Sequence, residues 1–107
     1  MSEEIPAAVQ RALTAIDEQD NDAFVAAFAA DGYVDDWGRQ FRGHDQIRSW
    51  SENELIGKRA TFTGTSVATP GNPLTILTQV GGEGFNGPSH FTFAIQGDHL
   101  ASMTITA

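Results

Sequence analysis

Apolar residues recur every three to four positions in the first third of the chain and every second position in much of its second half. The first spacing places apolar side chains on one face of a helix, and alternation places them on one face of a strand. The helical spacing predicts a helix over residues 5–19. After an acidic turn it predicts a second helix ending near Asp31 and Gly32, because glycine readily takes the left-handed conformation that ends helices. The stripe of the first helix consists of Ile5, Val9, Leu13 and Ile16.

The middle of the chain predicts a hairpin followed by a short third helix. Ile47 and Trp50 give this helix its apolar face, and Gly57 is a natural stop. The hairpin combines aromatic residues with glycines, which is typical of short strands joined by a tight turn. Its predicted strands are residues 33–37 and 40–42, with the turn at Gly38 and Arg39.

The helical period disappears after residue 58, and four longer strands are predicted instead. Threonine, β-branched and aromatic residues dominate these segments, and Gly, Pro, Asn and Asp separate them. Phe91, Phe93 and Ile95 share one strand face, which we expect to point inward. The predicted strands span residues 60–69, 74–80, 89–96 and 100–106.

Helices first and antiparallel strands second indicate an α+β fold, in which a curved sheet packs one face against the helices. A chain of 107 residues without a linker or repeat is long enough for one domain, residues 1–107.

Composition excludes several classes of partner and site. The chain has no cysteine, so it forms neither disulfides nor a thiolate metal site. A formal net charge of -8 repels phosphate backbones and anionic lipid surfaces, so we expect neither nucleic acid nor membrane as a partner. The acidic residues 1–5 lack the basic flank and apolar core of a signal peptide, and we expect a cytoplasmic protein.

Aromatic side chains and two adjacent carboxylates gather between residues 31 and 50. Apolar walls with one or two polar groups are the usual construction of a ligand pocket. Asp35 and Asp36 follow one another on a predicted strand, so they point to opposite faces and at most one enters such a pocket. Val34 shares a face with Asp36, which favours Asp36 as the inward residue. The residues expected to line the pocket are Tyr33, Val34, Trp37, Phe41, Trp50, Phe62, Phe91 and Phe93.

The three histidines fall in a predicted helix start, a strand and a turn, without the spacing of metal ligands, so we expect no metal and no cofactor. His90 faces away from the inward aromatic residues and becomes an acid/base candidate only if the strand register shifts by one residue. The glycine-rich segment 81–87 predicts a hairpin with Phe85 at its tip, either as a lid over the pocket or as a dimer contact.

The order of elements, together with the segments Val-Asp-Asp-Trp-Gly at 34–38, Phe-Arg-Gly-His-Asp-Gln-Ile-Arg-Ser-Trp at 41–50 and Gly-Asp-His-Leu-Ala-Ser-Met-Thr-Ile at 97–105, resembles the nuclear transport factor 2-like superfamily. The resemblance is to its small SnoaL-like and ketosteroid-isomerase-like members. It implies a cone-shaped half-barrel with a mainly antiparallel sheet, a pocket at the open end, and a homodimer formed through the outer sheet face.

The same resemblance places Asp36 where ketosteroid isomerases carry their catalytic base. A carboxylate beside aromatic rings is a usable general acid or base. The rest of that machinery is absent, since Ala12 takes the place of the oxyanion-hole tyrosine and Ser89 or Phe91 that of the protonated aspartate. Steroid isomerisation is therefore not expected. The Asp-Arg-Asp set of limonene-epoxide hydrolases also lacks strand-borne carboxylate partners here.

Three hypotheses for function follow from these observations. The first is a pocket protein that binds a small, largely apolar molecule, with Asp36 as acid/base in a cofactor-free isomerase, cyclase or dehydratase type of step. The second is a ligand-binding module of the same fold without chemistry. The third is a dimeric interaction domain that uses the outer sheet face.

Overall fold

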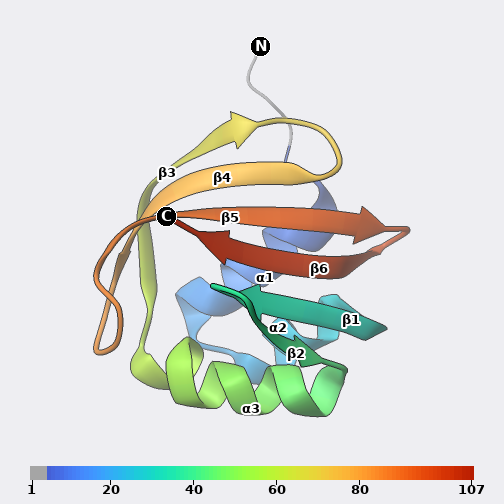
Figure 1. The fold of residues 1–107 in the computed structure, drawn as a ribbon, viewed down its shortest axis with the longest axis horizontal. Helices are drawn as coiled ribbons and strands as arrows, with labels where there is room; N and C mark the ends of the chain where they lie inside the picture. Colours follow the sequence, from blue (N-terminus) through green and yellow to red (C-terminus); the bar gives the residue numbers. More distant parts are fainter. Residues whose placement is uncertain (1–4) are drawn as a thin grey trace.

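Two helices, a hairpin, a third helix and four long strands follow one another in the computed structural model of residues 5–107 (Figure 1). Residues 1–4, which carried the expectation about targeting, lie outside the described residues. None of the described helices is long and apolar enough to span a membrane. The elements are α1 (Ala7–Glu18), α2 (Asn21–Ala26), β1 (Phe28–Asp36), β2 (Arg39–Arg42), α3 (His44–Glu54), the 3₁₀ turn η1 (Ile56–Lys58), β3 (Thr61–Thr69), β4 (Leu74–Gly81), β5 (Gly87–Gln96) and β6 (His99–Thr106).

The six strands form one unclosed sheet in the order β2-β1-β6-β5-β4-β3. Every neighbouring pair is antiparallel except β1 and β6, which run parallel. In Figure 1, α1 and α2 lie behind the sheet, α3 runs beside β1 and β2, and β3 curves strongly. A register shift between Thr63 and Ser66, next to Gly64 with its positive φ, accounts for part of this curvature. The predicted α+β fold with a curved, mainly antiparallel sheet is confirmed.

The core lies between the helices and the concave face of the sheet. Alternation sets the inward side chains on each strand, and the predicted inward residues Phe91 and Phe93 are indeed buried. Phe24 of α2 meets Phe28 of β1 edge to face, with ring centroids 5.3 Å apart. The largest fully buried side chains are Phe24, Phe28, Phe93, Ile16, Ile47, Leu74, Ile76, Leu100, Met103, Val9, Val25 and Val34.

The second helix is shorter than predicted, because it ends at Ala26 and the chain enters β1 at Phe28. Pairing with β6 outweighs the helical propensity of this alanine-rich segment: Leu100 N donates a 2.8 Å hydrogen bond to Ala27 O. Gly32 is therefore not a helix stop. It lies inside β1, where a Cβ atom would sit 3.0 Å from Leu100 O, so glycine permits the close approach of β6.

The hairpin turn between β1 and β2 is displaced by one residue from the prediction. Its two central residues are Trp37 and Gly38, with φ of 55° and 93°, and Arg39 is already paired with Asp36 across the strands. Two positive φ values are typical of a type I′ turn, which suits the twist of a hairpin. Asp35 Oδ1 accepts a 2.8 Å hydrogen bond from Gly38 N and so stabilises the turn.

Candidate functional site

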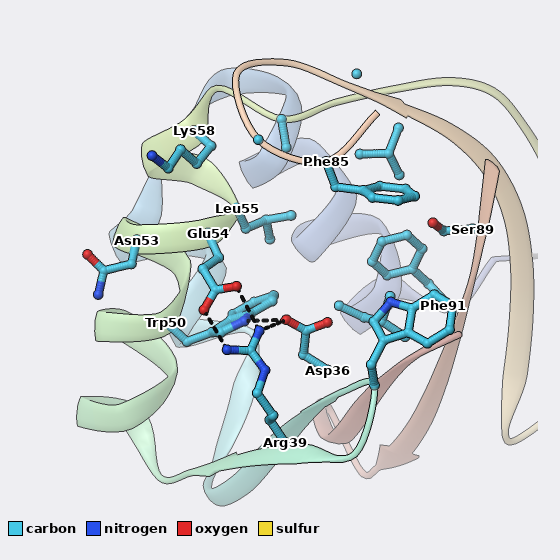
Figure 2. Close-up of a pocket in the computed structure, with 16 residues that line it drawn as sticks. Asp36, Arg39, Trp50, Asn53, Glu54, Leu55, Lys58, Phe85, Ser89 and Phe91 are labelled. Atoms are coloured by element: carbon cyan, nitrogen blue, oxygen red, sulfur yellow. Dashed lines mark hydrogen bonds and ion pairs between the residues drawn. The ribbon is translucent and has the colours of Figure 1, made fainter. Parts of the chain in front are cut away.

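A cavity of about 310 Å³ lies between α3, the β1–β2 hairpin and the inner face of β4, β5 and β6 (Figure 2). Most of its wall is apolar, and a few polar side chains reach it. Figure 2 shows that the head groups of Asn53 and Lys58 point away from its centre. The lining residues are Asp36, Trp37, Arg39, Trp50, Asn53, Glu54, Leu55, Lys58, Ala60, Val80, Gly81, Gly84, Phe85, Ser89, Phe91 and Ile105.

Asp36 is the last residue of β1, and strand alternation places it on the same inner face as the buried Val34. Its side chain is 13% exposed. Both of its hydrogen bonds to described residues fall on Oδ2, from Trp50 Nε1 at 3.1 Å and from Arg39 Nη2 at 2.5 Å. Oδ1 points into the cavity (Figure 2). This oxygen is placed to accept a hydrogen bond or a proton from a bound molecule.

Arg39 links the hairpin to the end of α3. Its guanidinium donates from Nη2 to Glu54 Oε1 at 2.7 Å and from Nη1 to Oε2 at 3.1 Å, a bidentate pair, and it also contacts Asp36. These two carboxylates, Glu54 first, raise the pKa of the Arg39 guanidinium above its usual range. The arginine thus carries its positive charge at any pH at which the protein is folded, and it fixes one oxygen of Asp36.

Trp50 belongs both to the core and to the cavity wall. It lies on the buried face of α3, one turn after Ile47. Its ring packs against Phe24 and Phe41, with centroid distances of 6.4 Å and 6.1 Å. Because Trp50 is buried among these contacts, its indole N–H is held toward Asp36 and the hydrogen-bond donor is preorganised.

Two exposed aromatic side chains stand at the rim of the cavity. Trp37 is 59% exposed and Phe85, in the loop between β4 and β5, is 55% exposed. The turn at Trp37, with its positive φ, brings this side chain to the cavity. The Phe85 ring covers Gly87, where a Cβ atom would come within 3.1 Å of it. Glu83 N donates to Lys58 O at 2.8 Å and anchors the loop.

The structure brings together four of the residues predicted for the site: Asp36, Trp37, Trp50 and Phe91. The other five do not line this cavity. Val34 and Phe93 are buried in the core, and Phe62 packs behind Phe91 with ring centroids 4.7 Å apart. Phe41 lies against Trp50, and Tyr33 lies beneath the Arg42 guanidinium at 4.7 Å.

Sequence reasoning missed several lining residues, among them the polar residues Arg39, Glu54 and Ser89. Glu54 is fifteen positions from Arg39 on another element, so no local spacing indicates their contact. Ser89 could have been found from alternation, because it shares the inward face of β5 with Phe91.

The histidines do not reach the cavity. His90 lies on the opposite face of β5, where Nδ1 is 2.8 Å from Ala107 O. His44 Nε2 is 2.8 Å from Phe28 O at the start of α3. Among residues 5–107, no group of three or more His, Asp or Glu side chains is arranged to hold a metal ion.

Comparison with known proteins yields one family and many similar folds. The SnoaL-like domain model matches residues 2–98. A search of curated proteins finds no match. Among solved structures, a candidate polyketide cyclase from Sinorhizobium meliloti is 21% identical, with a TM-score of 0.81 and 95% of each chain covered.

Two further structures contain small molecules. A hypothetical protein from Catenulispora acidiphila with a ketosteroid isomerase-like fold, in complex with trimethylamine, is 23% identical; its TM-score is 0.79, with 97% of this chain and 87% of that chain covered. A Mycobacterium tuberculosis protein in complex with estradiol-17β-hemisuccinate is 15% identical; its TM-score is 0.79, with 97% and 95% covered. At these identities the likeness is one of fold.

Proposed function

The chain belongs to the SnoaL-like domain family, and on that premise we propose that its cavity binds a small, largely apolar molecule. We further propose that Asp36 acts on this molecule as a general acid/base. The step would be of the isomerase, cyclase or dehydratase type, and it would use side chains of the protein without a cofactor.

The observation that carries the proposal is the asymmetry of the Asp36 carboxylate. Trp50 and Arg39 hold Oδ2, while Oδ1 faces an apolar cavity. A base must lie within hydrogen-bond reach of the proton that it takes, and its own orientation must be fixed. Both requirements are met by a carboxylate with one held oxygen and one free oxygen.

In the proposed step, Asp36 Oδ1 takes a proton from a carbon next to a carbonyl group. The C–H bond breaks, and its electron pair moves through the new C=C bond to the carbonyl oxygen as an enolate. Asp36 then returns the proton to the same or another atom of the molecule. The donors on Oδ2 stay in place throughout, so the carboxylate does not reorient between the two transfers.

A ligand-binding module without chemistry is the second candidate. It is favoured by the ion pair itself, because a carboxylate held by Arg39 can serve as a fixed acceptor for a ligand donor without exchanging a proton. The fold is compatible with both functions, since similar structures hold trimethylamine in one case and an estradiol conjugate in the other.

Exchange of the protons next to the carbonyl of 1-tetralone in heavy water, followed by proton NMR, separates the two candidates. We expect the protein to accelerate exchange and Asp36→Asn to lower the rate by about a hundredfold. Asp35→Asn is the matched control, because Asp35 stabilises the turn and does not line the cavity. Binding without accelerated exchange in the unmodified protein would support the second candidate and overturn the first.

We also propose that two copies associate through the outer face of the sheet. Leu77 is 38% exposed there, beside threonines such as Thr75 and Thr92, whose hydroxyl groups are 2.9 Å apart. A sheet face that carries several threonines and an exposed leucine suits contact between two identical sheets.

A further inference from the structure

The charged side chains of the cavity wall leave one negative charge that faces its interior. Among the lining residues, Asp36 and Glu54 are acidic, and Arg39 and Lys58 are basic. The Arg39 guanidinium contacts both carboxylates, at 2.5 Å and 2.7 Å, and so offsets one of their two charges. The Lys58 ammonium points away from the centre of the cavity (Figure 2). The charge that remains on this network reaches the cavity at Asp36 Oδ1.

Four aromatic side chains line the same cavity. Trp37 and Phe85 are exposed at its rim, and Trp50 and Phe91 are buried in its wall. The face of an aromatic ring carries partial negative charge, so it attracts an ammonium ion, and the attraction is stronger where water is excluded. Aromatic rings beside a carboxylate therefore form an environment that offsets the lost hydration of a cation.

The sign of the charge selects the ligand. An anionic ligand would meet Asp36 Oδ1, and the formal net charge of -8 would add to the repulsion. A neutral hydrogen-bond donor could bond to Oδ1, but it would leave the charge of the network without a counterion in a largely apolar cavity. A ligand with one positive charge supplies both the donor and the counterion.

The size of the cavity limits the body of the ligand. A volume of about 310 Å³ corresponds to roughly ten water volumes of about 30 Å³ each. Beyond the aromatic rings, Leu55, Val80 and Ile105 make the wall apolar. A hydrocarbon body of one or two rings fits such a space and leaves its charged group at Asp36.

We propose that the cavity takes a small organic ammonium ion, namely a protonated amine on a largely apolar body of one or two rings. The ammonium donates a hydrogen bond to Asp36 Oδ1, and the aromatic side chains contact the carbon atoms next to the nitrogen. The inference rests on the ligand binding proposed above and needs no proton transfer by Asp36.

Three bicyclic probes that differ in charge test this assignment. They are 1-aminotetralin, an ammonium ion at neutral pH, 1-tetralol, a neutral hydrogen-bond donor, and 1,2,3,4-tetrahydro-1-naphthoate, an anion. Quenching of tryptophan fluorescence reports binding, because both tryptophans of the chain line the cavity. We expect the ammonium to bind about tenfold more tightly than the alcohol, since a hydrogen bond between two ions is about twice as strong as a neutral one. The anion should bind more weakly than either.

Replacing Asp36 by Asn should remove the preference for the ammonium. The amide oxygen can stay with Trp50 and Arg39, so the NH₂ group then faces the cavity, and affinity for the ammonium should fall by about tenfold while affinity for the alcohol stays within about twofold. Asp35→Asn is the matched control, because it removes the same charge from a neighbour that does not line the cavity and should change no affinity.

Glu54→Gln tests the charge of the network while Asp36 stays in place. It removes one negative charge next to Arg39 and keeps the acceptor oxygen, so the preference for the ammonium over the alcohol should fall by about threefold. If Asp36→Asn does not fold, this variant and the comparison of the three probes on the unmodified protein still decide the question.

Several results would overturn the inference. Equal affinity of the unmodified protein for ammonium and alcohol would do so, and accelerated exchange of 1-tetralone in that case would leave the first candidate function standing. An equal loss of ammonium affinity in Asp35→Asn and Asp36→Asn would assign the preference to the net charge of the chain instead of to this cavity. Failure of all three probes and of 1-tetralone to bind would overturn the proposed ligand binding together with this inference.

Discussion

The indole N–H of Trp50 donates a 3.1 Å hydrogen bond to Asp36 Oδ2 and joins the buried face of α3 to the end of β1. The donor comes from a ring packed in the core, and the acceptor belongs to the cavity wall. This contact makes the position of the carboxylate a consequence of core packing. Arg39 adds a charged donor from the solvent side, so the carboxylate is fixed from two directions.

Replacing Trp50 by Phe should remove the donor and keep most of the packing. We expect a loss of about 1–2 kcal/mol in the free energy of unfolding, measured by urea denaturation, from the lost hydrogen bond and a small cavity. Acceleration of 1-tetralone exchange should fall as well, because Asp36 then has one donor instead of two. Trp37→Phe is the control, since it also removes an indole but no hydrogen bond to the carboxylate. Equal effects of the two substitutions on exchange would contradict this role of Trp50.

Trp37 occupies a turn position that disfavours it. A residue other than glycine with φ of 55° is strained, and asparagine followed by glycine is the preferred pair in such a turn. Trp37→Asn should therefore raise the free energy of unfolding by about 0.5–1 kcal/mol. The same change removes an aromatic side chain from the cavity rim and should weaken binding of 1-tetralone.

Gly38→Ala is the companion variant in the same turn. A Cβ atom at Gly38 would meet nothing within 4 Å, so its effect comes from the backbone alone. At φ of 93° alanine should cost about 1–2 kcal/mol, measured in the same urea titration. Destabilisation by Trp37→Asn would contradict the expected turn strain, and unchanged affinity for 1-tetralone would contradict a role of Trp37 in binding.

Periodicity was sufficient to predict α1, α3 and the four long strands, because each buries one face and the burial sets the pattern. It failed at the end of α2. There the alanine-rich sequence is compatible with helix, and the chain becomes a strand only because β6, more than seventy positions later, supplies a parallel edge for Phe28. Such long-range pairing leaves no local signal.

In the candidate site, too, local patterns were predictable and long-range contacts were not. Alternation along β1 and the aromatic character of the hairpin pointed to Asp36, Trp37 and Trp50 as neighbours. The contact between Arg39 and Glu54 depends on how α3 packs against the hairpin, which single-sequence reasoning does not determine. Phe93 and Val34 were assigned to the pocket because they face inward. In a half-barrel some inward residues fill the core and others line the cavity, and alternation along a strand does not distinguish between the two groups.

Burial should decide the effect of truncating two phenylalanines. Phe93 is fully buried, so Phe93→Ala should lower the free energy of unfolding by about 3–5 kcal/mol in urea denaturation. Phe85→Ala is the matched control at an exposed position. Its effect on stability should stay within about 0.5 kcal/mol, while affinity for 1-tetralone falls through lost contact. A large loss of stability in Phe85→Ala would indicate that the loop between β4 and β5 is part of the core.

Association through the outer sheet face predicts a particle of twice the chain mass of 11.5 kDa in sedimentation equilibrium. Leu77→Glu should shift this particle toward the single chain. In an isologous interface each substitution is present twice, and the new carboxylates add to the repulsion between two chains that each carry a formal charge of -8. Gln10→Glu, on the exposed face of α1, adds the same charge away from the sheet and should leave the mass unchanged. A single-chain mass for the unmodified protein across micromolar concentrations would contradict the interface, and an equal shift in both variants would assign the effect to net charge instead of to this face.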